Sequence, residues 1–171
     1  DGEETYLSLK ASSTTTFFNV GIKKILSTKE INEGRIKNKQ GIQLLNLFGI
    51  DNKRFCTIYN PDVETKSGIV KVKPKDPKGL RVLLESGIGF GYHVVHKKGS
   101  KIFHKQMDRK TMQKAAKVGN LTIYYGGKSG KGKRIDIEME SPLYIFKINI
   151  RDTQGKDGYP TRMMCDFKDK I

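Results

Sequence analysis

Residues 143–151, LYIFKINIR, repeat their chemistry every two positions, as a strand does. The large apolar side chains fall at alternate positions, Tyr144, Phe146, Ile148 and Ile150. Lys147 and Asn149 belong to the opposite face, because successive side chains of a strand point to opposite sides. A strand of this kind indicates a sheet with one buried face and one solvated face.

The same period continues through the C-terminal third and returns in the middle of the chain. Further strands are expected at residues 6–10, 54–59, 69–73, 80–84, 90–97, 101–105, 120–125, 133–140 and 161–167. Helices are expected at residues 27–34, 38–50 and 108–119, and Ser27 with Glu30 forms a capping box at the first of them. The pattern predicts a mixed α/β fold of the α+β kind, with a largely antiparallel sheet and two or three helices. We expect residues 1–171 to form a single domain.

The chain is strongly basic, with 33 Lys and Arg against 18 Asp and Glu and a formal net charge of +15. This excess favours nucleic acid as the partner, because binding to phosphates releases counterions. A membrane is disfavoured, since the sequence has no apolar span near 20 residues. Cys56 and Cys165 belong to no C-x-x-C pair and are expected to be buried thiols in a reducing compartment, the cytoplasm.

Two groups of side chains have the chemistry of metal ligands. His93 and His96 have an H-x-x-H spacing, but residues three apart on a strand face opposite sides, so we expect structural or DNA-contacting histidines. The second group consists of carboxylates at every second position of one strand, Asp136, Glu138 and Glu140. Such residues are about 6 to 7 Å apart. Pairing with Lys147 or other cations is therefore expected in preference to a shared divalent cation.

The stretch GGKSGKGKR, residues 126–134, lies between two expected strands and is rich in glycine. It differs from a phosphate-binding P-loop, because Arg134 stands where that motif needs Ser or Thr and no helix follows. We interpret it as a flexible hairpin tip that contacts a sugar–phosphate backbone and adds little to the core. Its proposed contacts are Lys128, Lys131, Lys133 and Arg134.

The expected helix at residues 108–119 carries a row of lysines on one face, Lys110, Lys114 and Lys117. This row is either a solvated helix face or a surface that lies along a phosphate backbone. Glu64 and Lys66 form an E-x-K arrangement, in which an acid binds magnesium and a lysine acts on the attacking water. Pro61 and Gly68 around them indicate a turn, so this pair is a minor alternative site.

The first residues indicate a hairpin whose first strand precedes the sequence. Asp1-Gly2 is a hairpin-turn dipeptide, and a strand follows it that ends at Lys10. We therefore expect the chain to be the later part of a longer one, truncated before Asp1. The chain starts with an acidic hairpin, continues with the stretch YLSLKASSTTTFFNVG and then enters a helix. In this order of elements, residues 1–25 resemble the restriction-endonuclease-like family, whose core is written PD-(D/E)xK.

This resemblance implies a restriction-endonuclease-like core, a catalytic Lys10 and a magnesium ion (Mg²⁺) held by the backbone carbonyl of Leu9. A further acid would lie on the strand before Asp1. Ser8 stands where the family usually has a carboxylate, and it would act as a weaker ligand or hold a metal-bound water. The hydroxyl residues that follow would contact nucleic acid, namely Ser12, Ser13 and Thr14.

Together these features predict a magnesium-dependent endonuclease of the restriction type that binds double-stranded DNA. The alternative is a non-catalytic nucleic-acid-binding module of a viral, phage or replication complex, because both classes need the same basic surface. A second copy of the chain or an N-terminal companion segment would be a further partner.

Overall fold

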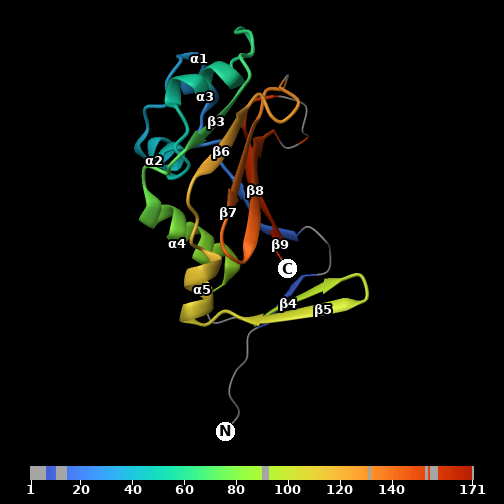
Figure 1. Cartoon of the computed structure of the whole chain (residues 1–171). Helices are drawn as coiled ribbons and strands as arrows, with labels where there is room; N and C mark the ends of the chain where they lie inside the picture. The colour runs from blue at the N-terminus through green and yellow to red at the C-terminus, as the bar shows by residue number, and fades with distance from the viewer. Residues whose placement is uncertain are drawn as a thin grey trace.

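The computed structural model describes residues 7–10, 15–89, 93–130, 132–152, 154 and 158–170, which form two sheets and five helices (Figure 1). The large sheet consists of β2 (Thr15–Gly21), β3 (Gly68–Val72), β6 (Leu121–Tyr125), β7 (Ile135–Glu140), β8 (Tyr144–Arg151) and β9 (Arg162–Asp169). Its strands are ordered β2-β9-β8-β7-β6-β3, and every neighbouring pair is antiparallel. The small sheet consists of β1 (Leu7–Lys10), β4 (His93–Lys98) and β5 (Lys101–Gln106), with β1 parallel to β4.

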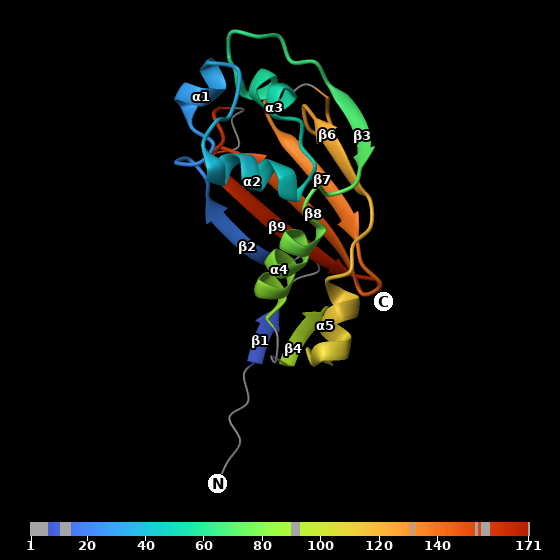
Figure 2. The same ribbon diagram turned by 90° about the vertical axis from the view of Figure 1, so that its left-hand side faces the viewer.

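The helices are α1 (Thr28–Asn32), α2 (Lys39–Leu47), α3 (Asn52–Tyr59), α4 (Pro77–Ile88) and α5 (Arg109–Ala115). Figures 1 and 2 place α2, α3 and α4 on one face of the large sheet. The β4–β5 hairpin and α5 lie at one end of this sheet, called the lower end because it is lower in both views. The opposite, upper end carries α1, α3 and the loop between β6 and β7.

The core lies between the large sheet and the helices that cover it. The alternation predicted for residues 143–151 is confirmed, because Tyr144, Phe146, Ile148 and Ile150 are all buried. Facing them, α3 and α4 contribute their apolar sides, namely Phe55, Ile58, Tyr59, Leu80, Leu84 and Ile88. The hydroxyl of Tyr59 accepts from the backbone N–H of Ile135 (3.0 Å), which joins α3 to β7. Packing of these faces, rather than helix propensity alone, stabilises such short helices.

Two segments that were expected to be strands are helical. Residues 54–59 lie in α3, where Asp51 caps the helix by accepting from the backbone N–H of Arg54 (2.7 Å). Residues 80–84 lie in α4, which begins with Pro77 after the N-cap Asp76. Both windows are short apolar runs, in which a period of two cannot be separated from a helical period. The mixed α+β class with an antiparallel sheet is confirmed, with five helices in the described residues instead of two or three.

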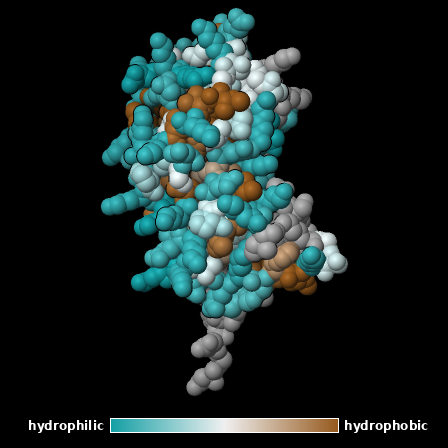
Figure 3. Space-filling view, in the orientation of Figure 1, coloured by the Kyte–Doolittle hydropathy of each residue, from teal (hydrophilic) through white to brown (hydrophobic). Residues whose placement is uncertain are grey.

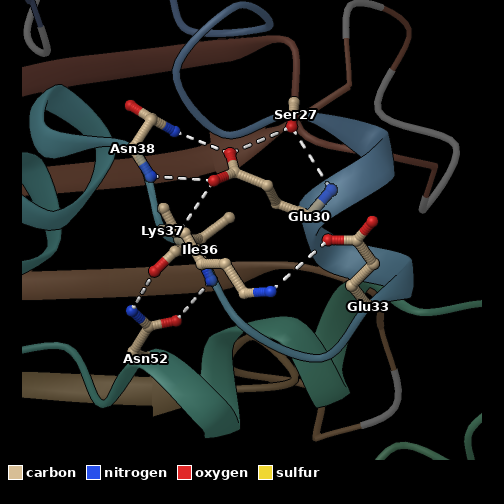
Figure 4. Close-up of polar contacts among 7 residues, drawn as sticks. All are labelled: Ser27, Glu30, Glu33, Ile36, Lys37, Asn38 and Asn52. Atoms are coloured by element: carbon tan, nitrogen blue, oxygen red, sulfur yellow. Dashed lines mark hydrogen bonds and ion pairs between the residues drawn. The ribbon is translucent and has the colours of Figure 1, made fainter.

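Glu30 organises the junction between α1 and α2 (Figure 4). The predicted capping box is present, since the backbone N–H of Glu30 donates to Oγ of Ser27 (3.3 Å) and this hydroxyl donates to Oε2 (3.1 Å). The carboxylate also accepts from the backbone N–H groups of Lys37 (2.7 Å) and Asn38 (2.8 Å) and from Nδ2 of Asn38 (2.7 Å). Partial burial alone would raise the pKa of Glu30, but these hydrogen bonds, led by that of the Asn38 side chain, lower it.

Candidate nucleic-acid interface

The lower end of the molecule gathers exposed cations from a hairpin and a helix. Helix α5 starts at Asp108, which accepts from the backbone N–H of Thr111 (2.8 Å), and it buries Met112 and Ala115. Its exposed face carries lysines of the predicted row, Lys110 and Lys114, while Lys117 follows just after the shorter helix. Three further exposed cations come from the strand ends that flank the β4–β5 turn and from the start of α5, Lys97, Lys101 and Arg109. These six residues are called the basic end.

Sequence reasoning missed the last three of these cations. The stretch KKGSK, residues 97–101, combines turn residues with lysines. Whether these lysines add to the same basic surface as α5 depends on where the hairpin lies. Figure 1 shows the β4–β5 hairpin reaching out from the lower end of the large sheet. Lys105 holds it there, through an ion pair with the buried carboxylate of Asp169 on β9.

The glycine-rich loop between β6 and β7 lies at the upper end, apart from the basic end (Figures 1 and 2). Its backbone is closed by hydrogen bonds from Gly126 N–H to Arg134 C=O (2.9 Å) and from Gly132 N–H to Gly126 C=O (3.0 Å). Gly127 has a φ of 71°, and a Cβ there would overlap the side chain of Arg134. These contacts connect the two ends of the loop, and its expected flexibility stays a prediction.

Lys133 has a structural role in this loop. Its ammonium donates to the backbone carbonyls of Asn60 (2.7 Å), Val63 (3.0 Å) and Ile58 (3.3 Å). These carbonyls lie at and just beyond the end of α3, so Lys133 fastens the end of α3 to the loop. Its donors are directed at protein carbonyls and not toward a phosphate on the surface.

The other cations predicted for this loop are in ion pairs where the structure describes them. Lys128 pairs with Glu138, and Arg134 donates to Asp136 from Nη2 (2.8 Å) and Nε (3.1 Å). Lys131 lies outside the described residues. Contact between these cations and nucleic acid stays a prediction.

The three carboxylates of β7 are paired with cations, as expected. Besides the two pairs of the loop, Glu140 pairs with Lys170 (3.0 Å), and Glu138 lies opposite Lys147 in the register of β7 and β8. Burial would raise the pKa of Glu138, but the hydrogen bond and charge of Lys128 and the charge of Lys147 lower it. Within the described residues, no three His, Cys, Asp or Glu side chains form a group that could hold a metal ion.

The strand predicted to end at Lys10 is present as β1. In its parallel pairing with β4, Ser8 lies opposite Val94, Leu9 opposite Val95 and Lys10 opposite His96. The side chain of Leu9 is 72% exposed, whereas those of Ser8 and Lys10 are outside the described part. Residues Ser12, Ser13 and Thr14 are also outside it. The catalytic assignment of this strand stays a prediction.

Two of the histidines contact each other, and both cysteines are buried. His93 and His104 stack with ring centroids 4.9 Å apart, and Nδ1 of His93 lies 2.7 Å from Nε2 of His104. The prediction of buried thiols is confirmed for Cys56 and Cys165, which are both free. Burial raises the pKa of Cys56 to about 11, so this thiol stays protonated at neutral pH.

Glu64 and Lys66 lie in the loop of residues 60–67 between α3 and β3, and both are exposed. The expected turn is confirmed. Lys66 lines a pocket against α3, together with Lys53 and Arg54, and Glu64 does not. The strand misassigned at residues 54–59 concealed this pocket, because only a helix places residues 53, 54 and 57 on neighbouring turns.

The chain matches no family model, no curated protein and no solved structure. Among the described helices, none is long and apolar enough to cross a membrane.

Proposed function

We propose that the chain is a nucleic-acid-binding protein that holds double-stranded DNA against its basic end. One observation carries this proposal: six exposed cations of the basic end have no ion pair among the described residues. The single acid in residues 97–117 is Asp108, and its carboxylate is engaged in capping α5. Such uncompensated positive charge on a projecting hairpin and a helix face suits a phosphate backbone.

The cations described in the glycine-rich loop are less available to a phosphate backbone than those of the basic end. Acids of β7 neutralise Lys128 and Arg134, which pair with Glu138 and Asp136. Figure 3 shows a mainly hydrophilic surface with apolar areas at the upper end and at the level of the β4–β5 hairpin. Cys56 and Cys165 are unpaired and buried, which fits the reducing conditions of the cytoplasm, where we place the protein.

The test compares two variants that lose equal charge. Lys110, Lys114 and Lys117 are replaced by Ala in one variant, and Lys23, Lys24 and Lys29, which are exposed in and beside α1, are replaced in the other. Affinity for a short DNA duplex is measured by fluorescence anisotropy between about 50 and about 200 mM salt. The slope of log K against log salt should fall by about 2.7 in the first variant, at about 0.9 for each lost phosphate contact. Equal slopes in the two variants, or no binding of the wild type at low salt, would overturn the proposal.

Magnesium-dependent cleavage of the bound DNA is a second candidate function. It is favoured by the position of β1, because Lys10 lies opposite His96 on β4, next to the cation Lys97 of the basic end. DNA held at this end would pass near the end of β1. The resemblance of residues 1–25 to PD-(D/E)xK nucleases supports Lys10 as the catalytic lysine of this candidate function.

A further inference from the structure

A second basic site lies at the upper end, beside α3. It is a pocket of about 480 Å³ lined by Asp51, Lys53, Arg54, Thr57, Val63 and Lys66. Three of these residues are cations and one is an acid, so the lining carries two excess positive charges. The carboxylate of Asp51 is also engaged, since it accepts from the backbone N–H of Arg54 (2.7 Å). Pockets of this volume hold small molecules rather than a helix or a loop of a partner.

Arg54 is held in position within the pocket by β6. Its guanidinium lies 4.1 Å from the ring centroid of Tyr125, which is buried. The hydroxyl of Tyr125 accepts from the backbone N–H of Asp51 (3.0 Å), so the same residue also fixes the start of α3. The absence of a side chain at Gly68 leaves room for the guanidinium, because a Cβ there would overlap Nη2 of Arg54.

The guanidinium of Arg54 has unused hydrogen-bond donors. Among the described residues it makes a cation–π contact with Tyr125 but no ion pair or side-chain hydrogen bond. A planar guanidinium that is stacked and fixed in this way binds phosphate through two parallel N–H groups with little loss of entropy. Lys53 and Lys66 add two compact charges to the same pocket.

We propose that this pocket, the Arg54 pocket, binds the phosphomonoester of a nucleotide. A phosphomonoester carries a charge of about −1.5 to −2 at neutral pH, which matches the excess charge of the lining. The nucleoside lies against Val63 and the aliphatic parts of the lysines. Two sources supply this chemistry, a free mononucleotide and the phosphorylated end of a nucleic-acid strand. Only the second source rests on the function proposed above.

The experiment measures binding of deoxyadenosine 5′-monophosphate by NMR titration, with deoxyadenosine and inorganic phosphate as the comparison probes. The wild type should bind the mononucleotide about tenfold more tightly than either probe. Arg54→Gln should abolish this preference, and Arg54→Lys should lose most of it, because an ammonium lacks the planar pair of donors. Gly68→Ala should also lose it while keeping every charge, since the guanidinium is displaced. Arg81→Gln is the matched control, because Arg81 lies on α4 in an exposed pair with Glu85.

Two further measurements identify the source and separate this site from the basic end. A short DNA strand is titrated with and without a 5′-phosphate. If the wild type binds the phosphorylated strand more tightly and Arg54→Gln removes this preference, the ligand of the pocket is the phosphorylated strand end. If the two strands bind with equal affinity while the mononucleotide still binds, the ligand is the free nucleotide. The variant with Lys110, Lys114 and Lys117 replaced should bind the mononucleotide normally, and Arg54→Gln should keep the duplex salt slope. Unchanged mononucleotide affinity in Arg54→Gln, or equal affinity of the wild type for inorganic phosphate, would overturn the proposal.

Discussion

Replacing Lys133 by Met should destabilise the protein although the residue belongs to a surface loop. The substitution keeps the aliphatic stem and removes the ammonium that donates to Asn60 (2.7 Å) and Val63 (3.0 Å). Hydrogen bonds from a charged donor contribute about 1.5 to 3 kcal/mol each, so these two amount to about 4 kcal/mol. Fixing a lysine side chain costs about 2 kcal/mol of rotamer entropy. The expected loss in the free energy of unfolding is therefore about 2 kcal/mol.

The assay is thermal unfolding followed by circular dichroism, with Lys128→Met as the matched control in the same loop. A loss of about 2 kcal/mol should lower the Tm by about 4 to 8 °C in a chain of this size. Lys128 is 52% exposed in its pair with Glu138, and such exposed pairs contribute about 0 to 1 kcal/mol. The control should therefore melt close to the wild type.

DNA binding by the same variants separates a structural role from phosphate contact. The salt slope of duplex binding should not change in Lys133→Met, because the ammonium is directed at backbone carbonyls. A Tm within about 1 °C of the wild type together with a slope reduced by about 0.9 would refute the reasoning and return Lys133 to the phosphate contacts.

Two further outcomes test the α1–α2 junction and the cleavage candidate. Glu30→Gln should lower the free energy of unfolding by about 1.5 kcal/mol at neutral pH, measured by urea denaturation. Because the folded pKa of Glu30 lies below its ordinary value of 4.5, its stabilisation is complete above that value and is lost as the pH falls through the folded pKa. The difference between wild type and variant should therefore shrink in acid, and a growing difference would contradict the role of its hydrogen bonds. Lys10→Ala should abolish magnesium-dependent cleavage of DNA, with EDTA as the blank, and leave the affinity for DNA nearly unchanged. Lys10→Arg should not restore cleavage, and Ser8→Ala should reduce the cleavage rate less than Lys10→Ala does. Full cleavage by Lys10→Ala would show that β1 is not the catalytic strand.

Local pattern was sufficient for most strands of the large sheet, although not for β2, and for the helix ends that carry their own caps. The period of two in residues 143–151 predicted which side chains of β8 are buried, because one covered face imposes this alternation on any strand. The capping box of Ser27 and Glu30 likewise marked the start of α1, and the N-cap Asp108 marked the start of α5. Both could be predicted because a cap contacts only residues within the first turn of its helix. The identity of α3 and α4 was not accessible in this way. Their apolar runs fit either period, and packing against the large sheet selects the helix.

Composition predicted a basic protein, but the tertiary structure decides where its charges lie and which of them are paired. Lys133 and Lys110 are alike in sequence, yet one is bound by carbonyls beyond α3 and the other is exposed on α5. Arg54 and Gly68 are 14 positions apart and meet because α3 and β3 pack at the same end of the sheet. Ion pairs and pockets arise from contacts between residues distant along the chain, which a local pattern does not encode. The sequence therefore determined the total charge and most of the strands, and tertiary packing decided which cations are paired and which are exposed.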